Sequence, residues 1–240
     1  MRLTILWLAA FLAAAPAYAI VIRPDRDDAE YIELATRYPS TVALDAPDGG
    51  EGVLIAPRWV LTSASRAKAL QEKKPSAKVR FGEDNPEVQS VFVHPAWEGG
   101  ADNDIGLLLL RKAVRIEPNA LYREPDEKGK SVATAGHGSA DRKARASINT
   151  VDRVDAHTLG LRVKPLDDAS DLQGAATPGD IGGPAFVEVP AGIFVAGILS
   201  TIAGEWQDYA RVSAFVPWIE AVMLDVATKE MNARMDPDAR

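Results

Sequence analysis

The chain has 240 residues and a hydrophobic fraction of 47%, which suits a globular protein that buries a sizeable core. Its formal net charge is −7, so it has no electrostatic reason to bind nucleic acid. The absence of cysteine excludes disulfides, thiolate chemistry and cysteine-based zinc sites. His94, His137 and His157 are far apart and form no HExxH-type pair, so we expect neither a metal nor a cofactor.

The N-terminus has the pattern of a secretory signal peptide. Arg2 precedes a mostly apolar run over residues 3–15 and the small-x-small triplet Ala17-Tyr18-Ala19. The run is shorter than the roughly 20 residues that a membrane-spanning helix needs. We therefore expect a signal peptide over residues 1–19, cleavage after Ala19, and no stable membrane insertion of the mature chain. The mature protein would be secreted or periplasmic, and the sequence leaves both destinations open.

Beyond the signal peptide, short strands alternate with turns rich in Gly, Pro, Asp and Asn. A short helix is expected first, over residues 28–38. The expected strands then cover residues 41–44, 52–55, 59–62, 79–81, 88–94, 105–111, 131–135, 158–163, 184–189 and 192–200. At the end of the chain, apolar residues at helical spacing predict a helix over residues 216–231. So many short strands predict an all-β barrel or sandwich.

The sequence predicts one internal linker. Residues 113–130 hold two prolines and many charges, and they lack strand alternation. This linker would separate an N-terminal β barrel over residues 20–112 from a C-terminal β barrel over residues 131–215. A polar tail over residues 232–240 would follow the last helix.

Several segments, in order, resemble motifs of the trypsin/chymotrypsin-like serine peptidases. Residues 52–66 resemble the family's run that ends in Thr-Ala-Ala-His-Cys, and residues 102–107 resemble its Asn-Asp-Ile-Ala-Leu. Residues 179–184, Gly-Asp-Ile-Gly-Gly-Pro, resemble Gly-Asp-Ser-Gly-Gly-Pro. Shorter resemblances fall at residues 93–95, 136–138, 197–200, 209–213 and 218–219. The resemblance implies two packed six-stranded antiparallel β barrels, an active site in the cleft between them, and a C-terminal α-helix.

The positions that match the catalytic triad have largely lost their chemistry. The family uses a Ser nucleophile, a His base and an Asp that orients the His. Here the matching residues are Ile181, Ser65 and Asp104. An Ile side chain has no lone pair, and a Ser hydroxyl has no basicity near neutral pH, so neither residue can fill its role. We therefore expect a catalytically degenerate member of the family.

The resemblance also implies further roles. Backbone N–H groups of Gly179 and Ile181 would form the oxyanion hole. The mature N-terminus at Ile20 would form an ion pair with Asp180. The floor of the specificity pocket would fall near Ala175, which gives no reason to expect selection of Arg or Lys.

The sequence leaves two hypotheses for the function, and a third possibility is that the protein is an evolutionary remnant without a function. In the first, the protein binds a peptide or protein ligand in the inter-barrel cleft and has a regulatory role. The alternative is a serine-type endopeptidase or other hydrolase with a rearranged site, which would use Ser63 or Ser65 with Asp104. No histidine offers a replacement base, because the Val-His-Pro context of His94 matches another position. The oligomeric state and the identity of the ligand stay open.

Overall fold

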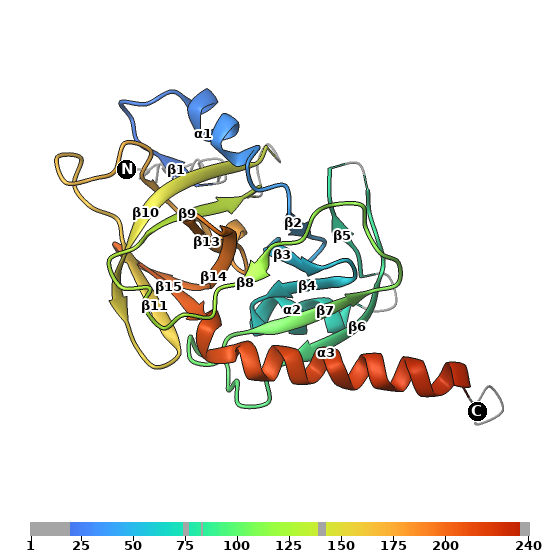
Figure 1. Cartoon of the computed structure of the whole chain (residues 1–240). Helices are drawn as coiled ribbons and strands as arrows, with labels where there is room; N and C mark the ends of the chain where they lie inside the picture. The colour runs from blue at the N-terminus through green and yellow to red at the C-terminus, as the bar shows by residue number, and fades with distance from the viewer. Residues whose placement is uncertain (1–19, 74–76, 83, 139–142, 236–240) are drawn as a thin grey trace, which may run out of the picture.

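The computed structural model describes residues 20–73, 77–82, 84–138 and 143–235, so the expected signal peptide lies outside the described residues. Two β units lie side by side, and a long helix runs along one side of them (Figure 1). No helix in the described ranges is long and apolar enough to span a membrane.

The C-terminal unit is a closed antiparallel barrel. Its strands follow the order β13-β9-β10-β11-β15-β14, and β14 pairs back to β13. A further strand, β8, pairs in parallel with β14 and lies inside the segment expected to be the linker. The bounds are β8 (Ala120–Leu121), β9 (Ser131–Gly136), β10 (Arg145–Val154), β11 (Thr158–Arg162), β13 (Pro184–Val189), β14 (Gly192–Ala203) and β15 (Trp206–Arg211).

The N-terminal unit is a six-stranded antiparallel sheet in the order β5-β2-β3-β4-β7-β6. Its two outer strands meet at an isolated bridge between Lys78 and Glu87. The bounds are β2 (Thr41–Leu44), β3 (Glu51–Ala56), β4 (Trp59–Thr62), β5 (Val79–Arg80), β6 (Val88–Val93) and β7 (Gly106–Leu110). The predicted β architecture with a C-terminal helix is confirmed.

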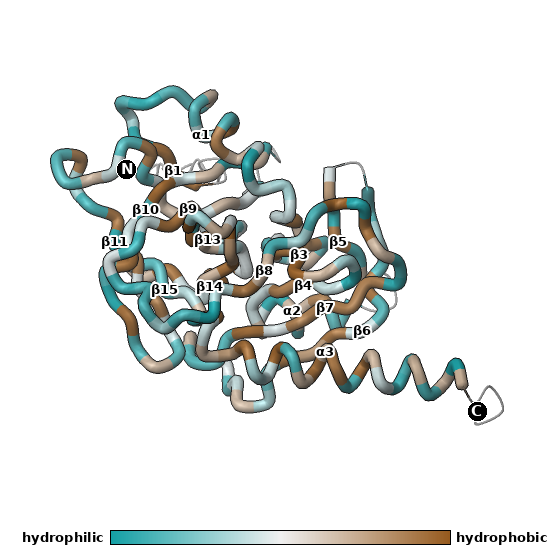
Figure 2. The backbone as a smooth tube through the Cα atoms, viewed as in Figure 1, coloured by the Kyte–Doolittle hydropathy of each residue, from teal (hydrophilic) through white to brown (hydrophobic). Residues whose placement is uncertain are grey.

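Three clusters of buried apolar side chains form the core. Leu54 and Leu108 belong to a cluster inside the N-terminal sheet, and Val187 belongs to one inside the C-terminal barrel. The third cluster lies between the units, where Val53 of β3 meets Phe186 of β13. Neighbouring residues of β3 thus face opposite sides, as the pleat of a strand requires. The hydrophobic stretches of the chain accordingly lie mostly in the central strands (Figure 2).

Two short helices flank the sheets. In α1 (Asp28–Ala35), Asp27 and Glu30 form a capping box at the first turn. The helix α2 (Ala64–Glu72) was not predicted, because the segment was read only as part of a family motif. Its signals are Ser63 as the N-cap and a run of good helix formers.

The C-terminal helix α3 (Val212–Met235) extends beyond both ends of the predicted residues 216–231. It begins directly after β15, where Arg211 and Ser213 both bond the buried carboxylate of Glu127. Near its other end, Glu230 forms an ion pair with Arg58 of the N-terminal unit. These polar contacts lie near the two ends of the helix, and they add to the packing of its apolar face.

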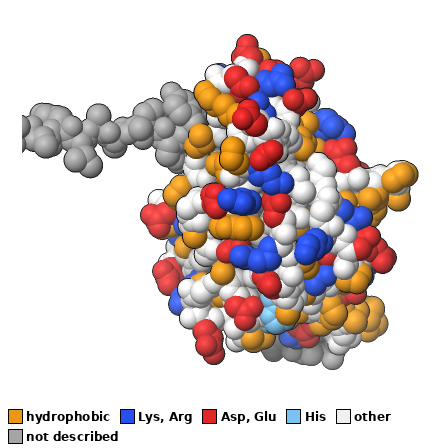
Figure 3. Space-filling model, turned by 90° about the vertical axis from the view of Figure 1, so that its left-hand side faces the viewer, with side chains coloured by type: hydrophobic (Ala, Val, Ile, Leu, Met, Phe, Trp, Pro, Cys, Tyr) orange, Lys and Arg blue, Asp and Glu red, His pale blue; other side chains and the backbone are white. Residues whose placement is uncertain are grey.

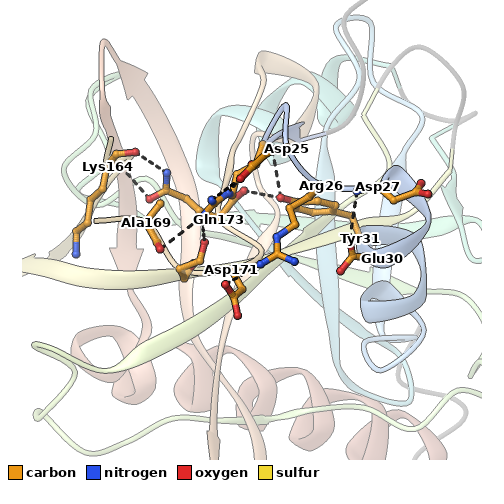
Figure 4. Close-up of polar contacts among 11 residues, drawn as sticks. Asp25, Arg26, Asp27, Glu30, Tyr31, Lys164, Ala169, Asp171 and Gln173 are labelled. Carbon is orange, nitrogen blue, oxygen red and sulfur yellow. Dashed lines mark hydrogen bonds and ion pairs between the residues drawn. The ribbon is translucent and has the colours of Figure 1, made fainter. Parts of the chain in front are cut away.

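The N-terminal segment is bound to the C-terminal barrel. Strand β1 (Val21–Ile22) pairs with β12 (Gly174–Ala175). The hydroxyl of Tyr31 donates to the Gln173 carbonyl at 2.9 Å and accepts from the Arg23 N–H at 3.2 Å (Figure 4). On this face of the molecule, acidic and basic side chains are interspersed (Figure 3).

Candidate functional site

Asp104 lies directly before β7 and is held by serines. Its carboxylate accepts hydrogen bonds from the Ser200 hydroxyl at 2.7 Å and from the Ser65 N–H at 2.8 Å. The Ser65 hydroxyl lies 3.4 Å from the same carboxylate. Asp104 is 2% exposed, and burial raises its pKa although the Ser200 and Ser65 hydrogen bonds oppose the shift. Ser65 therefore contacts the carboxylate that a histidine would contact in an active site.

Ser63 and Ser65 lie at the start of α2, and their hydroxyl oxygens are 2.9 Å apart. Ser63 is fully buried, and its hydroxyl accepts the Arg66 N–H at 3.3 Å as the helix N-cap. A hydroxyl in this position serves the helix and has no access to a bound substrate.

Ile181 directly follows the short 3₁₀ helix η1 (Pro178–Asp180), in which Gly179 is buried. The Ile181 N–H is directed at the Pro178 carbonyl, 3.5 Å away, within this turn. The Ile181 carbonyl accepts the Glu51 N–H at 2.9 Å. One of the two expected oxyanion donors thus points into its own turn, a conformation that the residue types could not reveal.

Arg66 connects α2 to η1. Its guanidinium donates to the Pro178 carbonyl at 3.1 Å, and its side chain is 14% exposed. The aliphatic part lies against Gly50, where an added Cβ would be 2.9 Å from the Arg66 side chain. Burial lowers the pKa of Arg66. The carbonyl that faces the Ile181 N–H is therefore also held by a cation from the segment that carries Ser65.

Asp180 is buried beside the first described residue. The Ile20 backbone nitrogen lies 3.2 Å from Asp180 Oδ2, and the same oxygen accepts the N–H and the hydroxyl of Thr177, each at 2.8 Å. Burial raises the pKa of Asp180, against the effect of these hydrogen bonds. Ile20 itself is 2% exposed, so this residue is buried.

Ala175 lies in β12, where its backbone pairs with Val21. The N–H of the next residue, Ala176, donates to the side chain of Gln207 at 2.8 Å. Gln207 is 1% exposed, so its side chain fills the space beside the expected pocket floor.

The family model described as Trypsin matches residues 33–219. The chain belongs to the trypsin family. A comparison with curated proteins gave no match. The matched span covers most of the chain and includes Ser65, Asp104 and Ile181, whereas Ile20 precedes it. The protein is thus a homologue of the trypsin-like serine peptidases.

A buried acid–imidazole pair joins the two units of this trypsin family member. Glu51 of β3 accepts the His137 N–H at 2.9 Å, and its other oxygen lies 2.9 Å from His137 Nδ1. Burial raises the pKa of Glu51 to about 7. Burial alone lowers the pKa of His137, but the hydrogen bond and charge of Glu51 outweigh it and raise that pKa. The pair was not predicted from the sequence, because no local pattern links residues 86 positions apart.

The other two histidines lie elsewhere. The ring of His94 packs against Phe215 and Trp218 of α3, with centroids 5.2 and 4.9 Å apart. His157 Nδ1 lies 3.0 Å from the Asp102 carboxylate. Neither ring bonds Asp104. Within the described ranges, no group of three or more His, Cys, Asp or Glu could hold a metal ion.

Proposed function

We propose that this trypsin family member is an exported, non-catalytic protein that binds a peptide or protein in the cleft between the β units and has a regulatory role. The observation that carries the proposal is Ile181 at the nucleophile position. A hydrocarbon side chain cannot attack a carbonyl, and no neighbouring change restores that ability. The fold around the position is that of the family, and a binding protein can use it without the nucleophile.

The surroundings of Asp104 support the loss of the base. In an active peptidase, a histidine takes the proton of the nucleophile, and the aspartate orients that histidine. Here the hydroxyls of Ser200 and Ser65 and the Ser65 N–H satisfy the carboxylate. A buried carboxylate with such partners is stable without a histidine. Asp104 then serves to hold the start of α2.

The oxyanion region supports the same conclusion. Catalysis requires N–H donors that point at the developing oxyanion before the reaction begins. The Ile181 N–H points at the Pro178 carbonyl, and Arg66 holds that carbonyl from the other side. Stabilisation of an oxyanion would first require this turn to rearrange.

The conformation of Ile20 supports export with cleavage after Ala19, into a periplasm or out of the cell. Ile20 has φ of 36°, a left-handed conformation that strains a β-branched residue while a peptide precedes it. A free amino group removes this torsion and turns the contact with Asp180 into an ion pair. This docking uses Ile22 and Arg23, where the family's Ile-Val-Gly-Gly start has two glycines.

A hydrolase with a rearranged site is the second candidate, since the hydroxyls of Ser63 and Ser65 and the carboxylate of Asp104 form a continuous chain. It lacks a base with a suitable pKa, and Ser63 is fully buried. Cleavage that depends on Asp104 would support it.

The test is incubation of the mature protein, starting at Ile20, with a broad peptide mixture and analysis of the products by mass spectrometry. The Asp104→Ala variant serves as the control, and circular dichroism shows that both proteins are folded. We expect no new peptide termini from either protein. New termini that vanish in Asp104→Ala would overturn the non-catalytic assignment in favour of the rearranged hydrolase.

Binding is tested with the same mixture on immobilised protein. We expect a subset of peptides to be retained saturably and released by excess free protein. The Ile181→Arg variant, which adds a charged side chain at the cleft, should retain at most about a tenth as much. Equal retention by the folded variant would place any binding outside the cleft and reject this part of the proposal.

A double replacement, Ser65→His with Ile181→Ser, tests how far the rest of the site has changed. We expect no cleavage above the blank, because the N–H at position 181 points inward and Arg66 holds the turn. Measurable cleavage would show that the turn opens readily when a substrate binds.

A further inference from the structure

A separate cleft of about 300 Å³ also opens between the two β units. It differs from the cleft proposed above to bind peptides, because none of the residues at the triad positions lines it. Its walls include Tyr38, Phe81 and Ile116. The Tyr38 ring stacks on Phe186 at a centroid distance of 4.8 Å, so this wall is well packed. The volume is at the lower end of the roughly 300–1,000 Å³ that is typical of small-molecule sites.

Thr41 lines this cleft, and its hydroxyl has no hydrogen-bond partner. It pairs across β2 and β3 with Val53, whose side chain belongs to the cluster between the units. The Thr41 side chain therefore also faces the C-terminal barrel. Thr41 is 6% exposed, and its Oγ1 has no hydrogen-bond partner. Leaving a buried hydroxyl unpaired costs about 1–3 kcal/mol, so such groups are rare unless a ligand or water completes them.

His137 lines the same cleft from the C-terminal unit and is 18% exposed. Glu51 occupies its backbone N–H and its Nδ1, which fixes the ring. Nε2 has no hydrogen bond to any described residue. Because Glu51 raises the pKa of His137, the ring favours the imidazolium form, in which Nε2 carries a proton to donate.

Arg80 makes this region positive. In β5 it pairs with Ala43, which pairs on its other side with Glu51, so the three side chains share one face of the sheet. Its charge is close enough to act on His137, and it forms no ion pair with a described residue. When Glu51 is ionised, its charge cancels that of protonated His137. The nearby Asp180 is bonded by Ile20 and Thr177, and the free amino group proposed above for Ile20 balances its charge, so Arg80 leaves the cleft suited to one negative charge.

We propose that this cleft binds a small molecule that carries one carboxylate on an apolar body. The carboxylate accepts hydrogen bonds from Thr41 Oγ1 and His137 Nε2 and lies near the guanidinium of Arg80. The body lies against the aromatic and aliphatic walls. Since the site shares no residue with the triad positions, the proposal stands whether or not the protein cleaves peptides.

The test is isothermal titration calorimetry of the protein, produced from the full chain, with sodium octanoate. The probe combines one carboxylate with an apolar tail, and 1-octanol is the uncharged control. Thr41→Val removes the hydroxyl and keeps the shape of the side chain, and Arg80→Gln removes the charge. Arg123→Gln, an exposed change outside the cleft, is the matched control. His137→Gln is avoided, because it leaves the buried Glu51 without its partner and endangers folding.

We expect saturable binding of one octanoate per chain. Thr41→Val and Arg80→Gln should each weaken it about tenfold or more, in line with the loss of one charge-assisted hydrogen bond or one charge. Arg123→Gln should leave it unchanged, and 1-octanol should bind at least about tenfold more weakly. The proposal is overturned by absence of saturable binding in the millimolar range, by equal affinity in the folded Thr41→Val and Arg80→Gln variants, or by equal binding of 1-octanol.

Discussion

Gly182 lies where three segments meet. It has φ of 90°, and an added Cβ would lie 2.3 Å from both the Glu51 carbonyl oxygen and Thr62 Oγ1. Those two atoms cannot easily move, because the Thr62 hydroxyl donates to the Glu51 carbonyl at 2.7 Å. We predict that Gly182→Ala lowers the free energy of unfolding by about 2–4 kcal/mol, as measured by urea denaturation.

Gly204 is the matched control for that substitution. It has φ of 60°, and an added Cβ would meet no atom within 4 Å. Gly204→Ala should therefore cost only the backbone strain, about 1 kcal/mol. Equal losses in the two variants would mean that strain, and not the contact between the units, explains the role of Gly182.

Single residues divide into those that a motif identifies and those that packing selects. Asp104 and Ile181 were identified because each lies in a run that matches the family in order. Arg66 lies beside Ser65 in the same run, but its role depends on the distance to Pro178, which no motif encodes. Gln207 could not be identified at all, since a polar residue in a β-strand is usually exposed.

At the scale of secondary-structure elements, Arg23 holds the N-terminal segment in place. The guanidinium donates to the Ser170 carbonyl at 2.8 Å and bonds both oxygens of Asp25. We predict that Arg23→Ala makes the amide hydrogens of Val21 and Ile22 exchange at least about tenfold faster, because β1 then opens locally. Hydrogen exchange followed by mass spectrometry measures this effect.

Arg26 provides the control for this element. Its ion pair with Asp171 is largely exposed, so Arg26→Ala should leave exchange in β1 nearly unchanged. If hydrogen exchange in β1 is also unchanged in Arg23→Ala, the pairing of β1 with β12 holds the segment without the contacts of Arg23.

The ends of α3 and the whole of α2 carry only weak local sequence signals. The apolar face of α3 ends before the helix does, so periodicity placed its end too early. In α2 only small residues and Leu70 are buried, which gives weak periodicity. The far end of α3 is held instead by a contact with the N-terminal unit, the ion pair between Arg58 and Glu230.

At the scale of the whole molecule, the Glu51–His137 pair links stability to pH. The pKa of Glu51 rises from 4.5 to about 7 on folding, and that of His137 rises from 6.5. Both groups bind protons more tightly in the folded state. Their stabilisation is present at low pH and lost as pH rises through the folded pKa values. We predict that the free energy of unfolding falls between about pH 5 and pH 8, with about 3 kcal/mol from Glu51.

Urea denaturation at several pH values tests this prediction, and Glu51→Gln is the comparison variant. The amide that replaces the carboxyl group cannot titrate, so the variant should show a flatter pH profile over the same range. As pH rises, the parent protein should therefore lose stability relative to the variant. A parent protein that becomes more stable from about pH 5 to pH 8 would contradict the assignment.

The amino-acid sequence by itself determined the β architecture and the order of the family motifs, and it indicated Ser and Ile at the positions that resemble those of the triad base and nucleophile. These are properties of residue identity and local spacing, and they need no coordinates. The tertiary structure alone decided which distant residues meet. Packing of the two β units brings Glu51 to His137 and Arg66 to Pro178, and docking of the N-terminal segment on the C-terminal barrel brings Ile20 to Asp180. Such contacts depend on strand register and on how the sheets pack. Neither can be predicted from short stretches of sequence, because both are set by residues far apart in the chain.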